Sequence, residues 1–284
     1  MDDLKFKYRD ASERTLNVIR NREIYFSPPE SLNDPLDSQI NIDKEYQRVV
    51  EMFPRNHSEE YLRKAFLIYL LNKHDFPGRD GKQLGLNGAL QWFLSRLGIF
   101  SLSLTPIDAL LWSHYGGSHM GVALGFDTNL IADERVFIRN EILYSERPQY
   151  QRVFLELAEK LGEFVRPWES DCEYSDELGD NFYTHQISQL MRANLLYKSD
   201  KWSYEKEYRL ISNRAGLCPF PAEALKTVVV GLKTDLEFVN KLQSILSVPE
   251  YSHVELLYVQ HLAGSYDFEL VKYHDSLMRL DLIT

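Results

Sequence analysis

Three short segments of the chain alternate apolar and polar residues with a period of two, which is typical of β-strands with one face against a core. These segments are residues 4–9, 99–104 and 204–212. A fourth, 121–126, is apolar throughout and predicts a strand buried on both faces. Segments with helical spacing separate the strands, so we expect a mixed α/β (α+β) fold.

Further elements follow from capping and turn residues. Asp10 and Glu13 have the spacing of a capping box and predict a helix that ends near Asn21. Thr105-Pro106 predicts a second helix, with proline at its first position, that ends before Gly116-Gly117. The final third is rich in predicted strands around one helix: strands at 227–231, 253–259 and 268–273, and a helix at 234–246.

The 284 residues contain no repeat, no low-complexity tract and no Gly/Ser linker. We therefore expect a single domain, 1–284. Two stretches, about 43–97 and 148–196, read as mostly helical and are interpreted as insertions into that domain.

Composition limits the possible partners. The formal net charge is −10, which argues against broad binding to duplex DNA because such binding depends on contacts from Lys and Arg to phosphate. Two cysteines are too few for a disulfide framework and suit a reducing compartment. We see no signal peptide and no apolar run of membrane-spanning length, so we expect a cytoplasmic protein with no membrane partner.

Polar residues gather on one face of three predicted strands. Arg9 shares its face with two lysines, Ser101 shares one with Ser103, and Glu205 shares one with Glu207. Two interpretations stay open: solvated faces of a half-exposed antiparallel sheet, or a functional site. Like charges on one strand face repel unless a cation or ligand lies nearby, which favours a site.

Two resemblances rest on these residues. Arg9 in KFKYRD, then Ser101 and Ser103 in IFSLSLT, then Glu205 and Glu207 in YEKEYRLI, resemble the ADP-ribosyltransferase superfamily of the Arg-Ser-Glu type. The middle motif departs from the usual pattern, since a leucine separates its two serines in place of threonine. The chain also resembles a large bacterial family of unassigned function, through KYR (7–9), YFSPPESLNDPLD (25–37), WSHYGGSHMGVALGFD (112–127) and KWSYEKEYRLI (201–211).

The transferase resemblance implies a split two-sheet core that holds NAD, as a substrate, in a cleft between the sheets. Glu207 would stabilise the positive charge that develops on the ribose, and Arg9 would hold the phosphate or adenosine side. Ser101, supported by Ser103, would orient the nicotinamide ribose, while Glu205 would lie beside the incoming nucleophile. The acceptor would be a protein, a nucleic acid or water, in a setting such as a bacterial toxin or a phage-defence effector.

Further candidates to contact NAD are aromatic and polar side chains near these strands: Tyr8, Phe26, Asn33, His114 and Tyr115. Each also has a structural interpretation. The first two are aromatic residues on strands, which are more often core residues, and Asn33 stands in a turn where Asn and Asp commonly cap backbone groups. Trp202 and Tyr204 precede the glutamates and either receive the acceptor or anchor the loop.

Two rival functions stay open. One is a non-enzymatic sensor module that binds a nucleotide or a partner on the same scaffold, with Glu205 and Arg209 as a structural ion pair. The other is a hydrolase that uses Glu205, Glu207 and His114. We expect no metal site, because His114 and His119 lack further ligands at suitable spacing.

Overall fold

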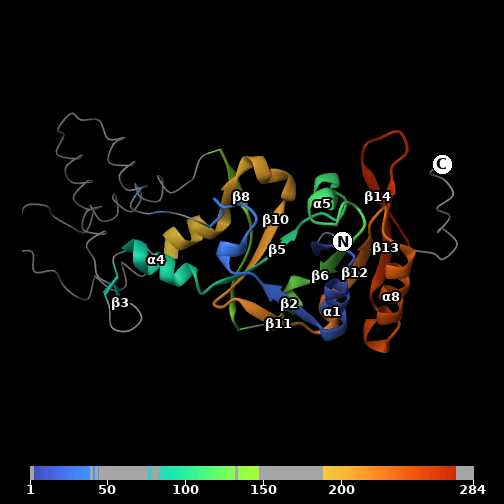
Figure 1. Cartoon of the computed structure of the whole chain (residues 1–284), viewed down its shortest axis with the longest axis horizontal. Helices are drawn as coiled ribbons and strands as arrows, with labels where there is room; N and C mark the ends of the chain where they lie inside the picture. Colours follow the sequence, from blue (N-terminus) through green and yellow to red (C-terminus); the bar gives the residue numbers. More distant parts are fainter. Residues whose placement is uncertain are drawn as a thin grey trace, which may run out of the picture. The chain divides into compact units, whose positions relative to one another are not determined.

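The computed structural model describes residues 3–38, 41, 44, 76–77, 83–84, 86–131, 134–146 and 188–272 (Figure 1). The chain divides into two compact units. The first comprises Met1–Phe26, Gly98–Ile142 and Lys201–Thr284, and the second comprises Ser27–Leu97 and Leu143–Asp200. The two stretches predicted as insertions, 43–97 and 148–196, both fall within the second unit.

The first unit is built on one eight-stranded sheet, in the order β14-β13-β12-β6-β1-β5-β10-β7. Its strands are β1 (Lys5–Arg9), β5 (Gly98–Ser103), β6 (Val122–Phe126), β7 (Val136–Glu141), β10 (Glu207–Ser212), β12 (Leu225–Val230), β13 (Glu255–His261) and β14 (Phe268–Lys272). β12 and β13 pair in parallel and the other neighbours are antiparallel. A large mixed sheet with a few helices confirms the α+β class. The split two-sheet core stays a prediction.

The remaining elements of the first unit are short. The helices are α1 (Glu13–Asn21), α5 (Ala109–His114) and α8 (Leu236–Leu246), with 3-10 turns η3 (Thr128–Leu130), η4 (Asp200–Glu205), η5 (Ala222–Ala224) and η6 (Pro249–Tyr251). β2 (Glu23–Phe26) and β11 (Gly216–Pro219) form a separate antiparallel ribbon. None of the helices among the described residues has the length and apolar character needed to cross a membrane.

Two helix starts differ from the prediction. α1 is capped at Ser12 rather than at Asp10, and the Asp10 carboxylate instead accepts hydrogen bonds from Ser12 and Thr15. α5 begins at Ala109, because the Asp108 carboxylate accepts from the backbone N–H groups of the next helical turn. An aspartate at the N-cap accepts from backbone N–H groups of the first turn, which have no partner within the helix.

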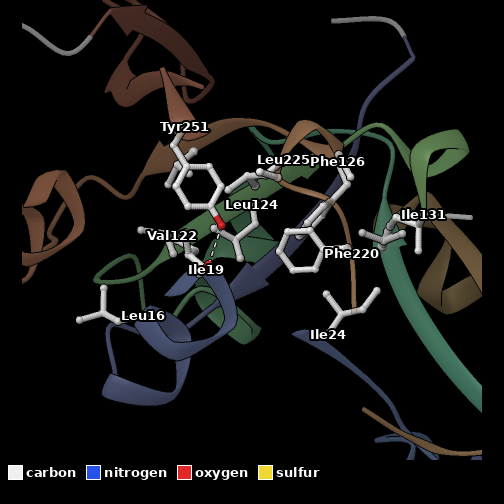
Figure 2. Packing of buried hydrophobic residues seen from close by; sticks show 14 of the residues in the cluster. Leu16, Ile19, Ile24, Val122, Leu124, Phe126, Ile131, Phe220, Leu225 and Tyr251 are labelled. Carbon is white, nitrogen blue, oxygen red and sulfur yellow. Dashed lines mark hydrogen bonds between the residues drawn. The ribbon is translucent and has the colours of Figure 1, made fainter. Parts of the chain in front are cut away.

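The sheet carries a hydrophobic core on each face. On one face, Leu16 and Ile19 of α1 pack with Val122 and Leu124 of β6, and the Tyr251 hydroxyl donates to the Ile19 carbonyl (Figure 2). On the other face, the core comprises Phe6, Tyr8, Leu111, Trp112, Ala123, Val229, Leu257 and Val259. β6 is buried along its whole length, which confirms the prediction from its unbroken apolar run.

The described part of the second unit is small. It contains α4 (Leu86–Leu94), a helix over 188–196, the 3-10 turn η1 (Pro29–Ser31), and the strand pairs β3 (Phe76–Pro77) with β4 (Gln83–Leu84) and β8 (Leu143–Ser145) with β9 (Tyr197–Ser199). Residues 91–94 and 188–196 are therefore helical as predicted, whereas α4 begins at Leu86, inside the segment 74–88 that was expected to be a loop. The predicted helices within 45–75 and 148–187 lie outside the described residues.

Candidate functional site

The pairing of β5 with β10 brings the serines and one glutamate together. Glu207 lies directly opposite Ser103, and Arg209 lies opposite Ser101. Directly paired residues of antiparallel strands point to the same face of a sheet, so these four side chains share one face. Phe6 of β1 also pairs with Ser103, which places the four on the face that carries the core of Phe6 and Tyr8. Figure 1 shows β5 and β10 side by side.

Arg9 belongs to the opposite face. It pairs with Val122 of β6, whose side chain is part of the other core, together with α1. Its guanidinium Nε donates to the Thr15 hydroxyl at 3.1 Å, and burial lowers the pKa of Arg9. The structure therefore does not bring Arg9 together with Ser101 and Glu207. The side chains of β1 alternate as predicted. Alternation within one strand does not determine on which face a neighbouring strand presents its polar residues.

Glu207 and Arg209 form a buried, bidentate ion pair. Arg209 Nε lies 2.7 Å from Oε1 of Glu207, and its Nη2 lies 3.0 Å from Oε2. The two side chains are 4% and 0% exposed. Arg209 is thus a partner of Glu207, whereas the sensor interpretation expected it to pair with Glu205. Charge-assisted bonds to both oxygens fix the orientation of the carboxylate.

Glu205 lies outside the strand, in η4, so the prediction that it shares a strand face with Glu207 is wrong. Lys206 between them has a left-handed backbone with φ of 43°, which interrupts the alternation of a strand. Hydrogen bonds from the side chains of Tyr115 and Ser103 hold Glu205 itself. The Tyr115 hydroxyl donates to its carboxylate Oε1 at 2.6 Å, and the Ser103 hydroxyl donates to its backbone carbonyl at 2.7 Å.

A row of four rings adjoins Glu205. The His114 ring lies 6.2 Å from the ring of Tyr115 and 6.2 Å from the ring of Tyr204, and Trp202 lies 6.0 Å from Tyr204. His114 is exposed and the other three residues are half-buried. The end of α5 thus brings His114 and Tyr115 together with Trp202 and Tyr204 of η4, about 90 positions later in the sequence. The bond from Tyr115 to Glu205 joins the same two segments.

The other two aromatic candidates are core residues. Tyr8 is 7% exposed, packs edge-on against Trp112 at 5.0 Å between ring centroids, and donates its hydroxyl to the Thr105 carbonyl. Burial raises the pKa of Tyr8. Phe26 is 1% exposed and packs against Phe100 at 5.7 Å on the opposite side of the sheet. Tyr8 and Phe26 are therefore core residues, as their structural interpretation expected.

Asn33 belongs to the second unit, where it is exposed in a turn. In the same turn, the Asp34 carboxylate accepts from the backbone N–H of Leu36 at 2.9 Å, the capping role expected of such a residue. Asp37 ends the turn and pairs with Lys198 at 3.5 Å. Within the described ranges, no cluster of three or more His, Cys, Asp or Glu side chains is arranged to hold a metal ion.

Lys7 is the residue that the sequence analysis missed. Its ammonium donates to the backbone carbonyl of Ser101 at 2.9 Å. Burial, and then the charge of Arg9, lower the pKa of Lys7 to about 8. Glu207 and Glu205 act in the opposite direction, so the ammonium feels both carboxylates. Alternation alone places Lys7 beside Arg9, and only the strand arrangement shows that it reaches β5.

A comparison with protein families bears on one segment of this site. Residues 111–210 match the family described as "Protein of unknown function (DUF2971)". The DUF2971 match supports the predicted resemblance to a family of unassigned function. The matched segment contains Tyr115, Glu205, Glu207 and Arg209, and it ends within β10. No curated protein and no solved structure matches the chain.

Proposed function

We propose that this protein cleaves NAD at the bond between nicotinamide and ribose and transfers the ADP-ribosyl group to a macromolecular acceptor or to water. The bonding electron pair leaves with nicotinamide, the acceptor nucleophile bonds to the ribose C1′ atom, and the nucleophile loses its proton. The observation that carries the proposal is the direct pairing of Glu207 with Ser103, on a sheet face that Ser101 shares two positions along the same strand.

The sheet itself supports the split core that this chemistry uses. β1 pairs with β6 along five positions, from Lys5 to Arg9. It pairs with β5 at one position, between Phe6 and Ser103. The eight strands therefore consist of two well-paired groups, β14-β13-β12-β6-β1 and β5-β10-β7, joined by a short ladder. In the proposed split core, the two sheets would divide at this seam.

The side chains support distinct roles. A carboxylate beside the ribose favours the transition state if it is ionised and held in place before the reaction. Arg209 supplies both conditions for Glu207, since an ion pair requires the ionised form and two bonds set the orientation. Glu205, held by Tyr115, would position the acceptor nucleophile. Ser101 would orient the nicotinamide ribose.

One observation favours a second candidate, the non-enzymatic module that binds a nucleotide or a partner. Both oxygens of Glu207 accept hydrogen bonds from an arginine that is completely buried. Paired, buried charges of this kind also occur as structural elements with no role in chemistry. The two candidates differ in turnover: the first releases nicotinamide, and the second binds its ligand unchanged.

The deciding experiment follows nicotinamide release from NAD by chromatography, with and without cell extract as a source of acceptors. The informative variant is the double substitution Glu207→Met with Arg209→Met, because it removes both charges of the buried pair together. Glu223→Gln, an exposed site on η5, is the matched control.

We expect release by the wild type and by the control, and none by the folded double variant. Absence of release from the wild type under all conditions, together with a rise in melting temperature on adding NAD, would select the binding module. If NAD also leaves the melting temperature unchanged, both NAD-based candidates fail.

A further inference from the structure

The side chain of Lys7 bridges β1 and β5, which pair with each other at one position. Antiparallel register from Phe6 and Ser103 would pair Lys7 with Leu102 and then Tyr8 with Ser101, but the described ladder between these strands has only its first pair. At that point the Lys7 ammonium donates to the Ser101 carbonyl at 2.9 Å. A backbone acceptor that a strand would normally satisfy is satisfied here by lysine.

Lys7 holds this position against unfavourable surroundings. Its ammonium stands 5.2 Å from the centroid of the Phe100 ring and is partly stripped of water. The charged groups that act on it are Arg9 on its own strand, Glu207 on β10 and Glu205 on η4. The ring and the two carboxylates stabilise the cation, whereas burial and Arg9 oppose it.

We infer that Lys7 is a positioning residue, which holds Ser101 of β5 at a fixed distance from β1 where the ladder between the strands has ended. The structural part of this inference, that Lys7 holds Ser101 in place, follows from the geometry alone. The catalytic part, that this placement affects turnover, rests on the proposed function, in which Ser101 orients the nicotinamide ribose. Displacement of a substrate-positioning group by about 1 Å lowers the rate of an enzymatic reaction by up to about 100-fold.

The structural part is tested by amide hydrogen exchange over residues 99–104, in wild type, Lys7→Met and Lys7→Arg. Lys5→Met is the matched control, since Lys5 lies on the same face of β1 but donates to the exposed Asp3 carbonyl and stands over Tyr208. Loss of one hydrogen bond predicts exchange about tenfold faster in Lys7→Met. Wild-type exchange in Lys7→Met would overturn the inference.

A pH series on the wild type and the conservative Lys7→Arg variant tests the inference even if Lys7→Met does not fold. Raising the pH from 7 to 9 neutralises an amine whose pKa is about 8. Protection of the 99–104 amides, corrected for the intrinsic effect of pH on exchange, should fall over this range in the wild type. It should not fall in Lys7→Arg, whose guanidinium stays charged. Equal behaviour of the two proteins would contradict the inference.

The catalytic part is tested by the pH profile of nicotinamide release. We expect kcat to fall as the pH rises through about 8 in the wild type, and to fall by about 10- to 100-fold in Lys7→Met. Lys7→Arg should move the break to higher pH, and Lys5→Met should match the wild type. Turnover in Lys7→Met with wild-type kcat and pH profile would refute the catalytic role. If the wild type itself releases no nicotinamide, the proposed function fails while the exchange experiment still decides the role of Lys7.

Discussion

Arg209 and Glu207, two positions apart on β10, point to the same face of the sheet and bind each other through two bonds of 2.7 and 3.0 Å. Neither charge is accessible to solvent to any important extent, because the side chains are 0% and 4% exposed. The two opposite charges therefore neutralise each other inside this face of the first unit.

Removal of one member of the pair should destabilise the protein more than removal of both. Glu207→Met or Arg209→Met deprives the other buried charge of this bidentate partner, and breaking a buried ion pair costs about 3–5 kcal/mol. The double variant should recover most of that loss. Urea unfolding of the four proteins gives the coupling free energy directly. Additive losses would show that the two side chains do not depend on each other.

Substitution of Tyr115 by Phe removes a charge-assisted hydrogen bond to Glu205. The bond measures 2.6 Å and its acceptor carboxylate is on a residue only 6% exposed, so we expect a loss of about 1.5–3 kcal/mol in the free energy of unfolding. Tyr25→Phe removes a hydroxyl from a residue that is 52% exposed and should change stability by less than about 0.5 kcal/mol. Similar effects of the two substitutions, measured by chemical denaturation, would contradict this assignment.

The left-handed backbone of Lys206 stores strain between the two glutamates. Its φ is 43°, and the backbone is held by bonds from Leu104 N–H to its carbonyl and from its N–H to the Ser203 carbonyl. Lys206→Gly should raise stability by about 0.5–1 kcal/mol, because glycine adopts this conformation without a Cβ clash. It should also lower nicotinamide release, since the junction becomes more flexible.

Arg22→Gly provides the control for that strain. Arg22 follows α1 with φ of 57° and is exposed. Its substitution should stabilise to a similar extent and leave turnover unchanged. A Lys206→Gly protein that is more stable and fully active would show that the strain has no part in the function of the site.

His119 should make the protein sensitive to mild acid. Its Nδ1 atom is buried with no hydrogen-bond partner, the one such side-chain atom in the described part of the chain. Burial, and secondly Lys233, lower the pKa of His119 below its ordinary value of 6.5. Just below pH 6.5, His119 therefore binds a proton in the unfolded chain but not in the folded chain. The stability that is present above pH 6.5 is lost as the pH falls through this range.

We therefore expect the free energy of unfolding to fall between pH 7.5 and pH 5 more in the wild type than in His119→Asn, since asparagine tolerates the left-handed backbone of this position. Lys233→Met removes the repulsion and should reduce the sensitivity in part. Parallel pH profiles for the wild type and His119→Asn would exclude His119 as the source.

Periodicity predicted the strands that have one regular environment along their length. β1 and β6 match the predicted segments closely, because their residues are alternately or uniformly buried. β7 was not predicted: it carries a mixed pattern of half-buried and exposed residues at the edge of the sheet. β10 begins at Glu207 rather than at Tyr204, because Ser203, Lys206 and Leu104 form backbone bonds that end the preceding turn.

The sequence by itself determined which residues share a face within each strand, because side-chain direction alternates locally along any extended chain. It also identified the chemical groups of the site, which are those of two serines, two glutamates, a histidine and a tyrosine. The tertiary structure decided which faces meet. Register and strand order are long-range properties, so the pairing of Glu207 with Arg209, the separation of Arg9 from Glu207 and the contact of Lys7 with β5 follow only from the assembled sheet.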